Sequence, residues 1–111
     1  MAVSLSPVQP DRRFFARRIP FDKIVQAVEE VRGEEWDAFA GRHGDWGRDM
    51  TFYLARKQSG LSLREIGEKA GGMPYKTVGK AVERFEKKLA ENRVLQKIKK
   101  QILKEMSNVE T

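Results

Sequence analysis

Apolar residues recur at steps of three and four along most of this chain, a spacing that places them on one face of an α-helix. The clearest stripe predicts a helix that ends at about Leu89. We expect this helix to start at Pro74, because proline suits a first helical turn. Its apolar members are Val78, Ala81, Val82, Phe85 and Leu89. The other side carries the cations Lys76, Lys80, Arg84, Lys87 and Lys88. One face of this helix is therefore expected to pack, and the other is free to meet an anion.

A short helix with a strong start signal precedes this long one. Ser62 and Glu65 have the spacing of a capping box. In this motif the serine hydroxyl accepts from a first-turn amide, and the glutamate three residues on accepts from the amide of the serine. The helix is expected to begin at Leu63 and to stop at Gly71-Gly72, where glycine supplies a positive φ at low cost. A capped helix, a glycine turn and a basic helix in succession indicate a helix-turn-helix.

The remaining pattern predicts four more helices and no strand. Asp45 is a good N-cap for one of them, and Gly33 and Gly60 lie where two of them should end. The expected ranges are 21–31, 34–40 and 47–58, and a last helix is expected to follow a cap at Asn92. The chain is thus predicted to be a compact all-α domain of about six helices.

Residues 20–91 are expected to form the domain proper, and residues 92–108 a C-terminal helix. That helix carries the apolar stripe Leu95, Ile98, Ile102 and Met106. The stripe spans fewer than two heptads, so we expect it to pack back on the domain. Weak self-association through it is the alternative, which makes the chain a monomer or a weak dimer.

Composition supports a single folded domain. The chain has 111 residues, of which 40% are hydrophobic and 34% charged, and it contains no cysteine. Neither a disulfide framework nor a thiolate zinc site is therefore possible, and a reducing cytoplasm is the expected compartment. No apolar run has the length of a membrane span, so no membrane partner is expected.

Charge is distributed unevenly around a net +6. Residues 21–46 carry −4, whereas residues 1–20, 47–91 and 92–111 carry +3, +4 and +3. A basic domain with an acidic flank suits a molecule that turns one face toward a polyanion and another away from it.

The first nineteen residues are predicted to be a basic arm. Four arginines, at positions 12, 13, 17 and 18, bracket Phe14 and Phe15. The segment is either an arm that lies along phosphates or a strap that places its rings in the core.

Catalytic groups do not converge in the sequence. His43 is the one histidine, and it lies in a polar loop between glycines, so no histidine pair exists for a metal. Adjacent carboxylates such as Glu29-Glu30 and Glu34-Glu35 point in different directions on a helix. We expect no enzyme activity, no cofactor and no metal.

The stretch from Gly47 to Leu89 resembles the C-terminal DNA-binding domain of the bacterial replication initiator DnaA. The resemblance rests on the runs Arg48-Asp49-Met50, Leu54-Ala55-Arg56, Gly60-Leu61-Ser62-Leu63-Arg64-Glu65-Ile66-Gly67, Gly71-Gly72 and Thr77-Val78. With the helix at 21–31 it covers about residues 20–90. The run from Gly44 to Asp49 and the position of Tyr75 look more like a similar module at the C-terminus of transposases associated with repeated extragenic palindromes.

The resemblance implies a Trp-repressor-like fold that binds double-stranded DNA, in a nucleoid-associated protein of the bacterial cytoplasm. Its second helix would enter the major groove, and Arg48, joined by Arg42, would reach the minor groove. Gly79, which is costly in a helix interior, would allow the backbone close to the major groove. The residues implied nearest the bases are Tyr75, Lys76, Thr77 and Lys80. Those implied at phosphates are Ser62, Arg64, Arg84, Lys87 and Lys88.

One part of the family pattern is exchanged. The initiator reads its box through an Arg-Asp-His-Thr-Thr signature, and here the stretch is Met73-Pro74-Tyr75-Lys76-Thr77, which keeps the final threonine. A different DNA site is therefore expected. Two alternatives remain: a protein-interaction module that has kept the fold and lost the DNA, and a DNA-binding fragment of a transposase.

Overall fold

The computed structural model describes residues 19–110, with side chains to Met106, and the expected basic arm lies outside the described residues. Six helices account for most of this part of the chain, and no strand occurs in it. They are α1 (Phe21–Arg32), α2 (Trp36–Phe39), α3 (Trp46–Gln58), α4 (Leu63–Lys69), α5 (Tyr75–Glu91) and α6 (Arg93–Glu110). The predicted all-α fold and the number of helices are confirmed.

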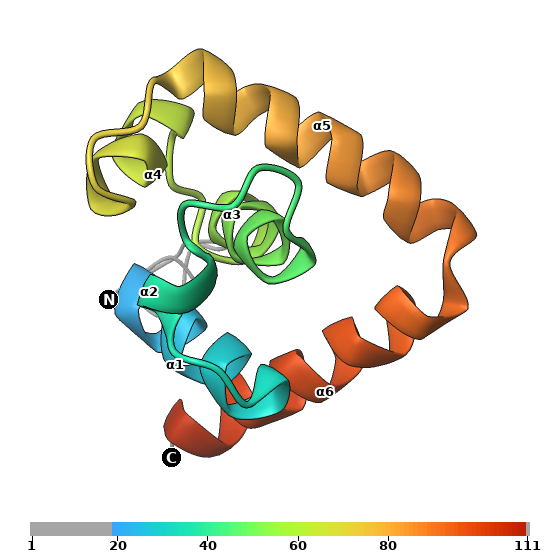
Figure 1. The fold of residues 1–111 in the computed structure, drawn as a ribbon. Coiled ribbons are helices and arrows are strands. Elements are labelled where there is room, and N and C mark those ends of the chain that lie inside the picture. The colour runs from blue at the N-terminus through green and yellow to red at the C-terminus, as the bar shows by residue number, and fades with distance from the viewer. Residues whose placement is uncertain (1–18, 111) are drawn as a thin grey trace, which may run out of the picture.

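Helix α3 is the centre of the arrangement (Figure 1). Helix α5 packs on α3, α3 packs on α1, and α1 packs on α6, while α4 lies against α5. The core between them is apolar, and its largest side chains with almost no exposure include Phe39, Phe52, Phe85, Ile24 and Met50. Burial of such aromatic and aliphatic groups supplies most of the driving force for this packing.

The helix ends follow the predicted capping signals. The Asp45 carboxylate accepts from the amides of Gly47 and Arg48 at the start of α3. Both halves of the predicted capping box form at the start of α4, since Ser62 Oγ accepts from the Glu65 amide and Glu65 Oε1 from the Ser62 amide. Gly33 and Gly60 have φ of 79° and 67°, as expected just beyond a helix end.

The turn between α4 and α5 depends on three glycines. Gly71 and Gly72 have φ of 101° and 93°, which L side chains rarely adopt. Gly67 on α4 faces the backbone of the turn so closely that a Cβ there would overlap the carbonyl oxygen of Met73. In return, the Gly67 carbonyl accepts from the amides of Gly72 and Met73, both at 2.9 Å. The turn is therefore held against α4 by backbone contacts that only glycine permits.

Helix α5 begins one residue later than its sequence suggested. Pro74 has φ of −60° but an extended ψ of 141°, so it precedes the helix and Tyr75 is the first helical residue. The predicted stripe is confirmed, since the side chains buried on α5 are Val78, Ala81, Val82, Phe85 and Leu89.

Asn92 separates α5 from α6. Its φ of −120° and ψ of 107° break the helix, and its side chain caps α6 by accepting from the Leu95 amide at 3.0 Å. The two helices diverge from this junction (Figure 1). Leu95, Ile102 and Met106 bury one side of α6 in the core, so the other side faces away from α1 and α3.

Within residues 19–110, no helix is both long enough and apolar enough to span a bilayer.

Candidate nucleic-acid interface

The outward face of α5 carries three lysines. Because a helix advances by about 100° per residue, Lys76, Lys80 and Lys87 fall directly opposite the buried apolar stripe. All three side chains are exposed. None forms an ion pair with the side chains described, so their charge is available to a ligand. Glu83, also exposed, lies in the same row and partly offsets it.

Tyr75 and Arg64 meet at the N-terminal end of α5, to one side of the lysine row. The Arg64 guanidinium carbon lies 5.1 Å from the centre of the Tyr75 ring, within range of a cation–π interaction. Tyr75 is 44% exposed, a high value for a large aromatic side chain. This pair combines an aromatic surface with a forked donor, and it joins α4 to the start of α5. The contact could not be read from sequence spacing, because the two residues lie eleven positions apart across a turn.

Two predicted contacts on α5 are placed toward the flanks. Thr77 and Lys88 are exposed but lie away from the centre of the lysine row. Arg84 is half-buried, with 34% of its side chain exposed, and its Nη2 lies 3.4 Å from Asp49 Oδ2 on α3. Arg84 therefore has a partner inside the protein already, unlike Lys76, Lys80 and Lys87.

Arg48 does not lie where the resemblance implied. It is 3% exposed, and its guanidinium is enclosed between Asp49 and the ring of Phe52, 5.5 Å away. Its Nε donates to Asp49 Oδ1 at 3.2 Å, and Nη2 lies near the same oxygen without hydrogen-bond alignment. The first turn of α3 is packed under its neighbours, so this arginine offers nothing to a minor groove in this structure. Arg42 is exposed, but its guanidinium forms ion pairs with Asp45 at 3.4 Å and with Glu34 at 3.5 Å.

Ser62 and Gly79 also have structural roles. The Ser62 hydroxyl is engaged in the capping box of α4, so one of its lone pairs is already used. Gly79 was expected to let the backbone approach a groove, but a Cβ there would stand 3.1 Å from Leu63 Cδ1. Its lack of a side chain therefore allows α4 to pack closely on α5.

A partly buried ion-pair network holds the start of α3, and sequence patterns did not predict it. Arg32, the last residue of α1, donates from Nη1 and Nη2 to the two Asp45 oxygens at 2.5 and 2.9 Å, and from Nε to Glu34 at 2.7 Å. The Arg32 guanidinium also lies 4.3 Å from the centre of the Phe39 ring. Gly47 makes room for it, because a Cβ there would clash with Arg32 Nη1. The pairing of an arginine with an aspartate thirteen residues away has no local sequence signal.

The same network sets the ionisation of Asp45. Burial is the largest influence and opposes the charged form, but hydrogen bonds from Arg32 and from the amides of Arg48 and Gly47 outweigh it, so the pKa of Asp45 lies below its ordinary value of 3.8. The Arg32 hydrogen bond likewise lowers the pKa of Glu34. These groups are charged and paired near neutral pH.

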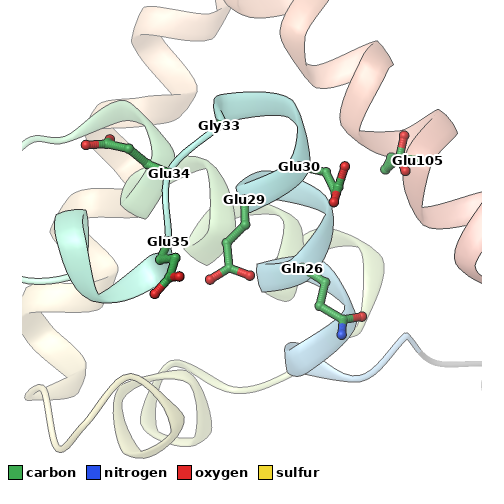
Figure 2. A pocket seen from close by; sticks show the side chains of 7 residues that line it. All are labelled: Gln26, Glu29, Glu30, Gly33, Glu34, Glu35 and Glu105. Atoms are coloured by element: carbon green, nitrogen blue, oxygen red, sulfur yellow. The ribbon is translucent and has the colours of Figure 1, made fainter.

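An open acidic hollow of about 640 Å³ lies between α1, the following loop and α6 (Figure 2). Five glutamates line it: Glu29, Glu30, Glu34, Glu35 and Glu105. Two of them have partners, since Glu29 Oε2 accepts from the Trp36 amide at 2.7 Å and Glu34 pairs with Arg32. No group of three or more His, Asp or Glu side chains suited to a metal ion occurs among the residues described.

The lysine row on α5 and the acidic hollow beside α1 thus lie on separate surfaces. A scan against models of known protein families gives no match, and no solved structure matches the chain.

Proposed function

We propose that this chain is a double-stranded DNA-binding protein in which α4, the glycine turn and α5 act as a helix-turn-helix. The observation that carries the proposal is the unpaired row Lys76, Lys80 and Lys87, directly opposite the buried stripe of a 17-residue helix. Exposed cations on one face of a rigid helix are able to contact a phosphate backbone. The resemblance to the DnaA C-terminal domain supports the same conclusion.

The N-terminal end of α5 is the part assigned to the bases. Tyr75, Lys76 and Thr77 lie in its first turn, and Lys80 lies one turn farther on. Tyr75 offers an apolar ring edge and a hydroxyl, Lys76 and Lys80 are donors to guanine, and Thr77 can contact a thymine methyl. Lys87 and Lys88, near the other end, would contact phosphates. Arg84 is assigned a lesser role because Asp49 already holds it.

The Arg64–Tyr75 contact gives the site its specificity in this proposal. Because Arg64 lies on α4 and Tyr75 on α5, the contact fixes the tyrosine ring at the entrance of the recognition helix. Arg64 belongs to a run shared with the initiator, but Tyr75 stands where the initiator's signature has histidine, so the preferred DNA sequence differs as well. Arg48, being buried, is not part of the proposed interface.

A titration against mixed-sequence duplex DNA tests the proposal. The variant Lys76→Gln, Lys80→Gln, Lys87→Gln should lose most of its affinity and reduce the slope of log K against log[salt] by about 0.9 for each phosphate that a lysine no longer neutralises. The control is Lys23→Gln, Lys57→Gln, Lys69→Gln, which removes the same charge from α1, α3 and α4. Equal affinity of the α5 variant and the control would reject the interface.

A second candidate is a protein-interaction module, and the acidic hollow is the observation that favours it. Glu30, Glu35 and Glu105 have no ion-pair partner among the described side chains, and Figure 2 shows that they come from separate segments around one space. A basic peptide is the kind of partner such a surface accepts. If the chain fails to bind duplex DNA even at low salt, this candidate replaces the first.

A further inference from the structure

Helix α6 carries a second row of cations that the proposed recognition helix does not use. Arg93, Lys97, Lys100 and Lys104 are spaced by four, three and four residues, so they fall within roughly 60° of one another around the helix axis. All four are exposed. We call this set the α6 basic row.

The α6 basic row lies opposite the buried side of its helix. Leu95, Ile102 and Met106 face the core, and the centre of their arc is about 180° from the centre of the basic row. The fifth cation of the helix behaves differently, since Lys99 is half-buried and its Nζ lies 5.7 Å from the centre of the Tyr53 ring. Arg93, Lys97 and Lys100 are thus turned away from the protein, while Lys104 also lines a second hollow together with Glu30 and Glu105.

The α6 basic row has no partner inside the described part of the chain. No ion pair or hydrogen bond joins the four side chains to any carboxylate described. The nearest acidic feature on the helix is Glu105, which lies on the flank toward α1 beside the acidic hollow. Four unpaired cations on one face repel one another, and a bound polyanion would relieve that repulsion.

The row has dimensions suited to a nucleic-acid backbone. From Arg93 to Lys104 the helix rises by about 16 Å at 1.5 Å per residue. A DNA strand presents a phosphate about every 3.4 Å along the helix axis, so the row extends past several phosphates. It is comparable in length and charge to the lysine row of α5.

The two rows face away from each other. Helices α3 and α1 lie between α5 and α6, because α5 packs on α3, α3 on α1 and α1 on α6. Each basic row lies on the side of its helix opposite this shared core, and the two helices diverge from Asn92 (Figure 1). One short, straight duplex therefore cannot contact both rows at once.

We propose that the α6 basic row binds the phosphate backbone of a second duplex segment, so that one copy of the chain bridges two stretches of DNA. The inference rests on the proposed function, because it assigns the first segment to α5. The α6 row is assigned no base reading, since it consists of lysines and one arginine without an aromatic or amide side chain among them. Binding there depends on charge and not on sequence.

The test uses two sets of 20-base-pair mixed-sequence duplexes, one labelled with a donor fluorophore and the other with an acceptor. Such duplexes are far shorter than the DNA persistence length of about 150 base pairs, so one molecule cannot bend around the protein. The wild-type chain should produce energy transfer between the two sets at low salt. Lys97→Gln, Lys100→Gln should lower bridging affinity and reduce its salt slope by about two, while leaving the affinity for the first duplex within about threefold.

Two controls separate the possible causes. Lys23→Gln, Lys57→Gln removes the same charge elsewhere and should leave energy transfer unchanged. Sedimentation of the protein without DNA shows whether it is a monomer at the concentrations used. Bridging that appears only where the protein self-associates, or that survives loss of the α6 lysines, overturns the inference.

The outcomes for the two proposals are distinct. Binding of one duplex without energy transfer rejects the α6 site and leaves the α5 interface standing. Absence of any duplex binding rejects both. Vesicles containing phosphatidylserine serve as a further probe, and if the α6 variant loses vesicle binding but not bridging, the row is a membrane-surface site instead.

Discussion

The charges at the start of α3 and the charges on the outer face of α5 differ in burial and in pairing. Around α3, Asp49 is 1% exposed and lies within ion-pair distance of Arg48 and Arg84. On α5, Lys76, Lys80 and Lys87 are exposed and have no acidic partner among the described side chains. The first set has ion-pair partners inside the protein, whereas the second has none among the described side chains.

This difference indicates which charges maintain the fold and which are free to bind. A buried charge without its partner carries a large desolvation cost, so the α3 groups are bound to one another. An exposed lysine loses little when it is replaced, because water already solvates it. Substitutions should therefore lower stability at α3 and lower DNA affinity at α5.

The largest effect on stability is expected at Asp49. Replacing Asp49 with alanine leaves the Arg48 guanidinium buried and unpaired, which should lower the free energy of unfolding by about 3 kcal/mol. Urea denaturation followed by circular dichroism measures this. Glu83→Ala, which removes an exposed carboxylate from α5, is the control and should change stability by less than about 0.5 kcal/mol. Equal effects of the two substitutions would contradict the distinction between the two regions.

A smaller effect is expected at Asp45, with a defined pH dependence. Asp45→Asn should lower stability by about 2 kcal/mol at pH 7, because it keeps a good helix cap but replaces the charged acceptor of the two Arg32 hydrogen bonds with a neutral amide. Since the folded pKa of Asp45 is lowered, its contribution is present above the ordinary value of 3.8 and is lost as pH falls through the folded value. The gap between wild type and Asp45→Asn should therefore close on acidification below about pH 4. A gap that is the same at pH 7 and pH 3 argues against this pairing.

A third, smaller effect on stability is expected at an exposed ion pair that joins α3 to α5. Lys57 on α3 and Glu86 on α5 form an ion pair at 3.0 Å, with both side chains 47% exposed. A double-mutant cycle with Lys57→Ala and Glu86→Ala should give a coupling energy of about 0.5 kcal/mol that falls with added salt. A coupling above about 2 kcal/mol would show that exposure is a poor guide to the strength of these interactions.

The smallest effect on stability is expected on α5 itself. Lys76→Gln, Lys80→Gln, Lys87→Gln should leave the free energy of unfolding within about 0.5 kcal/mol of wild type. Arg64→Ala and Tyr75→Phe should also fold normally, and they should change the sequences recovered from a random oligonucleotide pool more than general affinity. If wild type, Arg64→Ala and Tyr75→Phe all recover the same sequences, the Arg64–Tyr75 pair does not determine specificity.

Local signals in the sequence were sufficient to predict where the helices occur. The caps at Asp45, Ser62 and Asn92, the positive-φ glycines and the stripe of α5 all depend on residues within one or two turns of each other. The exposed lysine row followed from the same periodicity, since the side opposite an apolar stripe faces solvent. Helix existence was therefore predictable, and Pro74 shifted one boundary by a single residue.

Contacts between distant segments were not predictable in the same way. The Arg32–Asp45 pair, the burial of Arg48 and the approach of Gly67 to the Met73 carbonyl all depend on how helices meet in space. A single sequence shows that Arg48 is charged, but not that the first turn of α3 lies beneath its neighbours. For the same reason, the sequence alone suggested that Gly79 faces the major groove of DNA. In the structure Gly79 faces Leu63 on α4 instead.

The most direct test of the central proposal is to map which surface lies next to DNA. The chain contains no cysteine, so Lys80→Cys and Gln26→Cys each provide one attachment point for an iron chelate that cleaves nearby DNA, one on α5 and one beside the acidic hollow. The proposal predicts strand cleavage from position 80 and none above background from position 26. Cleavage from position 26 alone, or equal cleavage from both, would contradict the assignment of α5 as the recognition helix.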